Sequence, residues 1–308
     1  MAFDIVFMGT PEFAKEFLEH TYINKNFNIK AVYTQPPKKA HRGQKISSSS
    51  VYNFAKEKNL KVFCPTNFSL SEIDNIKKMK PDVILVVAYG LILPNEVLRI
   101  PTCGAVNVHA SILPKWRGAA PIHRCIINGY EKTGISIMKI EEGLDEGPTY
   151  LQSEIKIGLN DTFEDVYNNL IDVGKATLDI YFSTHQPYLP TPQDPKLASY
   201  AKKITKEEMQ IDFKDTAFKA HKKVCALSPK PGAWFILGSD KYKVFDTEFV
   251  PFDKFEKIDK SKNLILSFKK DFLLVKKIQK EGKNIISISE FERGYSSELQ
   301  NIKKKFST

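Results

Sequence analysis

Residues 2–18 read AFDIVFMGTPEFAKEFL and predict a strand, a tight turn and a helix in immediate succession. The apolar run ends before a Gly-Thr-Pro turn at residues 9–11, whose proline suits a first helical turn. Apolar residues then recur at helical spacing: Phe13, Phe17 and Leu18. The turn lacks the G-x-G-x-x-G pattern of dinucleotide sites, so a nicotinamide cofactor is not indicated.

Strands and helices continue to alternate after this unit. The apolar patterns predict strands at residues 29–34, 61–64, 83–88, 105–108, 134–140 and 151–157, and helices at 51–58, 71–79 and 162–183. Such alternation implies parallel pairing with right-handed crossovers, and therefore a Rossmann-like, doubly wound, mostly parallel α/β sheet. Sites in sheets of this type lie at the carboxyl ends of the strands.

The pattern changes after residue 184. Residues 185–195 are rich in proline and polar residues, which favours an extended linker. Short β-rich runs follow and indicate a small β-barrel of the OB-like type: 234–237, 243–245, 264–268, 272–275 and 285–288. We therefore predict a catalytic domain (1–184), a linker (185–206) and a C-terminal barrel domain (207–308).

The positive charge is concentrated in the last third of the chain. The formal net charge is +10, and residues 200–308 hold 24 Lys and Arg against 15 Asp and Glu, whereas residues 1–199 are nearly balanced. A domain with this bias attracts polyanions, which makes nucleic acid or an anionic membrane surface the expected partner. A lysine-rich, solubilising surface is the alternative, and the run Lys303–Lys305 taken alone suits a solvated face.

The cysteines and the apolar runs exclude several other classes. Four scattered cysteines without a C-x-x-C pair argue against a zinc knuckle and a disulfide framework. The longest apolar run, residues 83–93, is too short for a membrane span, and no secretory signal is visible. We expect a cytoplasmic protein that acts as a monomer away from membranes. A metal site at His109, His123 and Asp145 is conceivable, but no spacing demands it.

Residues 107–109, Asn-Val-His, end a predicted strand and begin the chemical core. Alternation along a strand sends Asn107 and His109 to the same side, where both can face one site. The pattern alone is weak, because an isolated N-x-H is more often incidental and its histidine structural. Its context decides the interpretation.

That context is the run ASILPKWRGAAP at residues 110–121, followed by GLDEGP at residues 143–148. Together with Asn107 and His109, these runs resemble the folate-dependent formyltransferase family, and specifically its branch that acts on methionyl initiator tRNA. The resemblance covers nearly the whole chain. Further matching segments are FMGTPEFA (7–14), TQP (34–36), RG (42–43), AYGLILP (88–94), IDF (211–213), SPKPGA (228–233), EGK (281–283) and residues 291–295.

The resemblance implies transfer of a formyl group from the co-substrate 10-formyltetrahydrofolate to the amino group of methionyl initiator tRNA, in translation initiation and without a metal. It also implies that Asn107, His109 and Asp145 form the catalytic trio. The Asn107 amide and a protonated His109 would stabilise the oxyanion. Asp145 would hold His109 in its charged form and accept the proton of the amine. Its neighbour Glu146 should point elsewhere.

Two further groups of residues follow from the resemblance. An apolar folate pocket with few polar groups is expected from residues beside two strand ends: Ser111, Ile112, Leu113, Pro114, Tyr89, Gly90, Leu91 and Ile92. For Leu91 and Ile92, simple core packing is the alternative. Binding of tRNA is expected from a basic loop with Arg42 as its main discriminating residue: Arg42, Lys45, Lys38 and Lys39. The basic barrel would grip backbone phosphates.

Three rival functions share parts of this pattern. An amino-sugar nucleotide formyltransferase and a formyl-folate hydrolase could use the same trio, but neither requires the basic loop or the basic barrel. A nucleic-acid-binding protein that has lost activity is the third. The sequence also departs from the family at Phe213, where a tryptophan is usual, at His123, where glutamine is expected, and at residues 47–50, which lack a customary proline.

Overall fold

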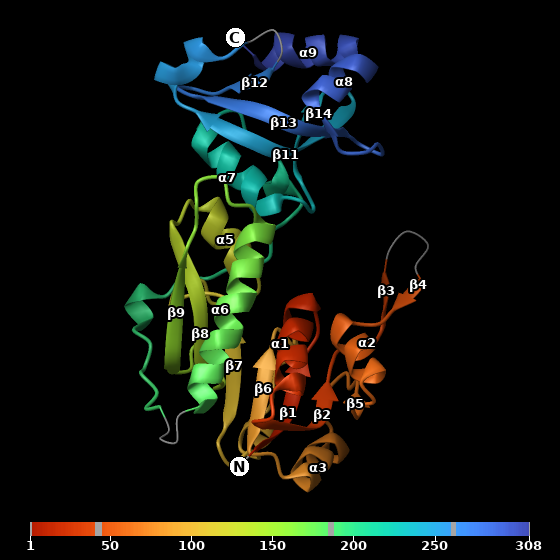
Figure 1. Ribbon diagram of the computed structural model, residues 1–308, viewed down its shortest axis with the longest axis vertical. Coiled ribbons are helices and arrows are strands. Elements are labelled where there is room, and N and C mark those ends of the chain that lie inside the picture. Colours follow the sequence, from red (N-terminus) through yellow and green to blue (C-terminus); the bar gives the residue numbers. More distant parts are fainter. Residues whose placement is uncertain (1, 41–44, 184–187, 260–262, 308) are drawn as a thin grey trace. The chain divides into compact units, whose positions relative to one another are not determined.

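Figure 1 shows the protein as a computed structural model that describes residues 2–40, 45–183, 188–259 and 263–307. The chain forms two compact units. Unit 1 comprises residues 1–118, 134–155 and 169–200, and unit 2 comprises residues 119–133, 156–168 and 201–308. The units are thus interleaved along the chain, and the contiguous domain boundaries expected at residues 184 and 207 remain a prediction.

Unit 1 is built on a seven-stranded sheet with the order β5-β2-β1-β6-β7-β8-β9. The strands from β5 to β7 pair in parallel, and β8 is antiparallel to β7. The predicted mostly parallel, doubly wound sheet is therefore confirmed. The bounds are β1 Phe3–Gly9, β2 Phe27–Tyr33, β5 Val62–Phe63, β6 Val83–Val87, β7 Ala105–His109, β8 Lys132–Lys139 and β9 Thr149–Lys156.

Helices cover both faces of this sheet. Ile73 and Ile76 of α3 and Val97 of α4 share one buried cluster with alternate residues of β1 and β6. On the other face, Gly174 of α6 lies against Phe17 of α1. The bounds are α1 Glu12–Ile23, α2 Ser50–Glu57, α3 Leu70–Met79, α4 Asn95–Leu98 and α6 Phe163–Ser183, which runs from unit 2 into unit 1. A short hairpin lies between β2 and α2 and consists of β3 Lys38–Ala40 with β4 Lys45–Ser47.

The burial of the central strands explains why their positions could be predicted from the sequence. All five residues of β6 are buried, with helices on both sides of the sheet. A strand covered on both faces reads as an unbroken apolar run, and the sequence of residues 83–87 is such a run. The polar residues that follow β6 and β7 therefore emerge together at the carboxyl edge of the sheet.

Unit 2 contains an antiparallel sheet with the order β10-β11-β13-β12, and β14 pairs with β13. This agrees with the expected small, OB-like β domain. Its strands are β10 Ala233–Leu237, β11 Asp240–Val250, β12 Leu264–Ser267, β13 Phe272–Lys280 and β14 Ile286–Ser287. Its helices are α5 Pro121–Ile127, α7 Ala217–Leu227, α8 Ile288–Gly294 and α9 Ser296–Phe306; short 3-10 turns lie at η1 Pro195–Leu197 in unit 1 and at η2 Glu207–Met209 and η3 Phe252–Lys257 in unit 2.

The C-terminal helix α9 completes the core of unit 2. Leu299 and Ile302 are fully buried, and Lys303–Lys305 form the last turn of the same helix. The ring of Phe306 stacks on Phe213 at 4.2 Å between centroids, and Phe213 also stacks on Phe268 at 5.4 Å. The phenylalanine at position 213 is therefore packed between two other rings.

No helix within the described ranges is both long enough and apolar enough to cross a membrane.

Candidate active site

Strand β7 places Asn107 and His109 at the edge of the unit 1 sheet. Asn107 pairs with Met138 of β8, and His109 pairs with Ser136 two positions further on. The imidazole is buried, with 6% of the residue exposed, whereas Asn107 is partly exposed. Among the described residues, none hydrogen-bonds to the Asn107 side chain, so its amide is available to a ligand.

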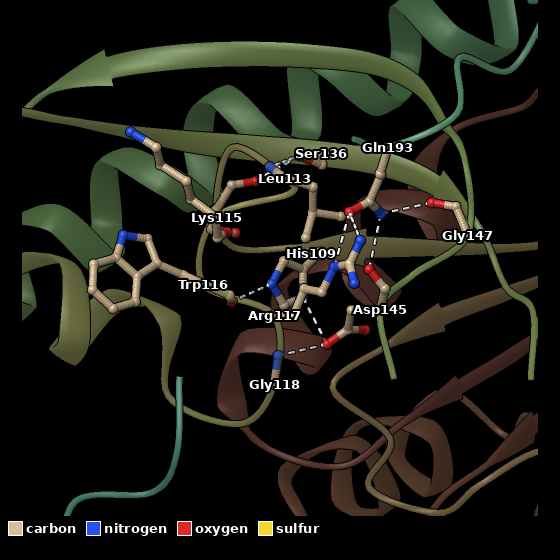
Figure 2. Close-up of polar contacts among 11 residues, drawn as sticks. His109, Leu113, Lys115, Trp116, Arg117, Gly118, Ser136, Asp145, Gly147 and Gln193 are labelled. Carbon is tan, nitrogen blue, oxygen red and sulfur yellow. Dashed lines mark hydrogen bonds and ion pairs between the residues drawn. The ribbon is translucent and has the colours of Figure 1, made fainter. Parts of the chain in front are cut away.

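Asp145 lies against His109 although it comes from the loop between β8 and β9. Its Oδ2 is 3.6 Å from Nδ1 of His109 and accepts a hydrogen bond from the backbone N–H of Gly118 at 2.8 Å (Figure 2). The backbone of Asp145 is left-handed, with a φ of 52°, in a loop that carries glycines on both sides. A left-handed, non-glycine residue is uncommon and often marks a functional position.

The second ring nitrogen of His109 is also engaged. Nε2 lies 3.0 Å from the backbone oxygen of Trp116, and a carbonyl oxygen only accepts hydrogen bonds, so Nε2 carries the hydrogen. Nδ1 then donates to Asp145 only in the doubly protonated imidazolium. Oxygen atoms therefore lie beside both ring nitrogens of His109.

Glu146, the neighbour of Asp145, points to a different partner. Its Oε1 is 3.2 Å from Nη1 of Arg117, whose side chain is buried. The expectation that Glu146 faces away from His109 agrees with this contact.

Arg117 and Gln193 form a polar link that the sequence did not predict. Gln193 accepts hydrogen bonds from Nε and Nη2 of Arg117 at 3.0 and 2.9 Å. Its Nε2 donates to the backbone oxygens of Asp145 and Gly147 at 2.8 and 2.7 Å (Figure 2). Gln193 belongs to the stretch expected to be an extended linker, and residues 188–200 of that stretch are part of unit 1. The only signal in the sequence was the place of Arg117 within a family motif.

The predicted folate residues at 111–114 divide into two kinds. Ser111 and Leu113 are buried, and Oγ of Ser136 donates to the Ser111 oxygen at 2.6 Å and accepts from the Leu113 N–H at 3.1 Å. These two residues therefore stabilise the conformation of the loop through buried contacts. Ile112 and Pro114 are partly exposed and can face a ligand.

The segment after β6 is similarly divided. Tyr89 is buried, and the side-chain amide of Gln35 donates to the oxygens of Tyr89 and Gly90 at 3.2 and 3.0 Å. Gly90 has a φ of 80°, which the turn requires. Leu91 is partly buried, whereas Ile92 is 91% exposed. Because β6 and β7 are adjacent and parallel, this apolar surface leaves the sheet at the same edge as His109.

Three of the four predicted tRNA residues lie on the strands of the β3–β4 hairpin. Lys38 is exposed and donates to Oε1 of Gln35 at 2.6 Å. Lys39 lies on β3 and Lys45 on β4, while Arg42 falls outside the described residues.

His123, the second histidine of the metal site considered from the sequence, stacks on Phe163 at 4.2 Å within unit 2, where burial lowers the pKa of its imidazole. The described residues contain no group of three or more His, Cys, Asp or Glu side chains arranged to hold a metal ion.

Comparisons with known proteins match both parts of the chain. The profile of the formyl transferase family matches residues 3–179, and that of the formyl transferase C-terminal domain matches residues 203–296. The chain is 39% identical over 300 residues to the methionyl-tRNA formyltransferase of Kosmotoga olearia, covering 94% of this chain and 96% of the relative. It is 38% identical over 296 residues to that of a Wolbachia species, covering 96% and 97%.

Solved structures share the fold at lower identity. The N-formyltransferase of Helicobacter canadensis, in complex with folinic acid and dTDP-3-aminofucose, aligns with a TM-score of 0.62 at 19% identity, covering 91% of this chain and all of that one. HypX of Aquifex aeolicus, in complex with tetrahydrofolic acid, aligns with a TM-score of 0.58 at 13% identity, covering 95% of this chain and 47% of that one.

Proposed function

Because the chain belongs to the formyl transferase family, within its methionyl-tRNA branch, we propose that Asn107, His109 and Asp145 carry out its reaction. The protein transfers a formyl group from 10-formyltetrahydrofolate to the amino group of methionyl initiator tRNA, for use in translation initiation. The observation that carries the assignment of residues is the contact between Asp145 and His109, which the Gly118 amide fixes from the other side.

The reaction makes two demands on these side chains. The amine attacks the formyl carbon, so negative charge develops on the formyl oxygen and a proton must leave the amine nitrogen. The bond between the formyl carbon and the folate nitrogen then breaks, and that nitrogen takes up a proton as tetrahydrofolate leaves. The Asn107 amide and the N–H of His109 are the donors for this oxygen, and one well-placed donor is worth roughly 3–4 kcal/mol in such reactions. Asp145 stabilises the imidazolium and accepts the amine proton, directly or through water.

The hydrogen bond between His109 and Trp116 indicates how substrate would enter. The Trp116 oxygen takes the Nε2 hydrogen in the structure, so a formyl oxygen has to replace it in order to receive that donor. Asp145 keeps its contact with Nδ1 during this exchange. The carboxylate and the formyl oxygen then lie at the two different ring nitrogens of the same imidazole.

The folate co-substrate supplies the formyl group when bound. The exposed Ile92 and the partly exposed Leu91 and Ile112 would cover its ring, and backbone groups beside Gly90 would bind its polar edge. Exposed apolar side chains next to backbone polar groups at a strand end suit a flat ring with a polar rim.

The tRNA acceptor requires positive charge outside the chemical site. The hairpin residues Lys38, Lys39 and Lys45, with Arg42, would contact the acceptor stem, and Arg42 would discriminate among tRNAs. Residues 207–308 would act as a basic tRNA-binding domain joined to the catalytic residues 1–184 by the linker. We infer a monomer that works in the cytoplasm, where initiator tRNA is used.

The first experiment is a formyl-transfer assay with labelled 10-formyltetrahydrofolate and three parallel acceptors: methionyl initiator tRNA, a nucleotide amino sugar and water. Label on the tRNA that is lost in a His109→Ala variant is the expected result. Label on the sugar, or release of labelled formate, would instead support a rival function on the same fold.

A further inference from the structure

We propose that Gln193 is a positioning residue for formyl transfer, which sets the loop of Asp145 and the loop of Arg117 relative to each other. The inference rests on the proposed role of Asp145. It assigns a function to residues 191–200, which are named here the strap.

Gln193 is central because it uses its whole amide group. Its oxygen accepts two hydrogen bonds from Arg117, and its nitrogen donates two to the oxygens of Asp145 and Gly147. All four distances lie between 2.7 and 3.0 Å. Only a side chain with both an acceptor and a two-hydrogen donor can make this set.

Arg117 makes the link rigid. The residue is 4% exposed, and a buried guanidinium is unfavourable unless its N–H groups are paired. Gln193 pairs Nε and Nη2, and Glu146 pairs Nη1. Two loops contact His109, one through the Trp116 oxygen and one through the Asp145 carboxylate. The hydrogen bonds of Gln193 connect these two loops (Figure 2).

A second residue of the strap holds the Trp116 loop from its other side. Oγ of Ser199 accepts the N–H of Trp116 at 3.0 Å, and its backbone oxygen accepts the N–H of Arg117 at 2.8 Å. The strap also pairs Thr191 with Thr149 at the start of β9. Hydrogen bonds therefore hold both ends of the strap. Because Gln193 lies between these ends, its own contacts require little further loss of conformational entropy.

The reaction is sensitive to this arrangement because a displacement of about 1 Å at reacting groups can cost roughly 100-fold in rate. Asp145 must face Nδ1 of His109 with its carboxylate while its backbone is held from behind. Gln193 binds the backbone oxygen of Asp145 and leaves its carboxylate untouched. Loss of Gln193 should thus reduce turnover without removing any group that binds either substrate.

The test compares two variants with a matched control. Gln193→Glu keeps an acceptor for Arg117 but places a carboxylate oxygen against the two backbone oxygens, and Gln193→Met removes all four hydrogen bonds at similar volume. Gln279→Glu is the control, since Gln279 also donates to a backbone oxygen, that of Lys283, in unit 2. Steady-state kcat and KM for both substrates, and the Tm, are measured for each protein.

We expect both Gln193 variants to lose about 10- to 100-fold in kcat, with KM within about threefold of the unaltered protein. Tm should fall most in Gln193→Met, which leaves two N–H donors of the buried Arg117 unpaired, and stay above the assay temperature in both variants. Unchanged kcat in either folded variant would overturn the proposal. A drop in Tm below the assay temperature in both variants would also overturn it, because it would show that the strap has only a structural role. Asp145→Asn is assayed in parallel. If it retains full turnover, the catalytic assignment itself fails, whereas an inactive Asp145→Asn beside active Gln193 variants rejects only the positioning role.

Discussion

Oδ2 of Asp145 lies 3.6 Å from Nδ1 of His109, on the side of the ring opposite the nitrogen that the Trp116 oxygen engages. The carboxylate is itself fixed by the Gly118 amide. The protein therefore fixes the Nδ1 side of the imidazole, whereas substrate can compete with the Trp116 oxygen for the Nε2 side.

Asp145→Asn should lower kcat by roughly 100-fold or more and change KM only a few-fold, because the amide retains the shape and an acceptor for Gly118 but cannot take up a proton. Initial rates at saturating and limiting folate separate the two constants. Asp172→Asn, at an exposed position of α6, is the control and should stay within about threefold of normal turnover. Full turnover in Asp145→Asn would remove Asp145 from the mechanism.

Ile92→Asp should raise KM for 10-formyltetrahydrofolate by roughly 10-fold or more, because a charge replaces apolar surface at the expected ring site. Ile92 is 91% exposed, so the free energy of unfolding should hardly change. Leu70→Asp is the matched control, since Leu70 is 82% exposed at the start of α3. Equal KM values in the two variants would place folate elsewhere.

Arg42→Ala should raise KM for methionyl initiator tRNA while folate binding stays normal, because the substitution removes one phosphate or base contact in the basic loop. Steady-state KM for tRNA and equilibrium binding of folate test the two halves. Arg99→Ala removes an exposed arginine after α4 and should change neither. An equal loss for both substrates would contradict a tRNA-specific role for Arg42.

His221 should make unit 2 less stable in acid. Its imidazole is fully buried, with Nε2 donating to the Leu159 oxygen and Nδ1 accepting from the Thr247 hydroxyl, and burial lowers its pKa to about 4 from the ordinary 6.5. Between these values the unfolded chain binds a proton that the folded chain does not. The stabilising contribution of neutral His221 to the free energy of unfolding is thus complete above pH 6.5, and it falls by about 3 kcal/mol as the pH drops to 4.

Urea unfolding at pH 7 and pH 4.5 measures this change. His221→Gln keeps a donor and an acceptor but does not titrate. In this variant, most of the difference in the free energy of unfolding between pH 7 and pH 4.5 should disappear. An identical pH dependence in the variant would show that other groups cause the acid sensitivity.

The sequence predicted the sheet of unit 1 because strands buried on both faces are continuous apolar runs, as residues 83–87 illustrate. It did not predict α5 or α9. Helix α5 has only seven residues, and α9 shows few apolar positions among lysines, with Leu299 and Ile302 buried. Short or highly charged helices depend on the tertiary surface that they cover, which local patterns do not reveal.

The candidate site was predicted in part for a similar reason. Asn107 and His109 share a strand, so their common side follows from alternation, and Asp145 follows from family resemblance. Gln193 was missed because it lies 76 residues from Arg117 in a stretch with the composition of a linker. Two of its four hydrogen bonds go to backbone oxygens, which carry no sequence signal.

The interleaving of the two units has a consequence for attempts to separate them. The chain passes between unit 1 and unit 2 after residues 118, 133, 155, 168 and 200. A single proteolytic cut near residue 200 would leave residues 119–133 and 156–168 attached to the N-terminal fragment, although α5 packs on α7 in unit 2. The nicked halves should therefore co-purify as one particle, and a gene ended at residue 200 should yield an aggregating product with the apolar face of α5 uncovered.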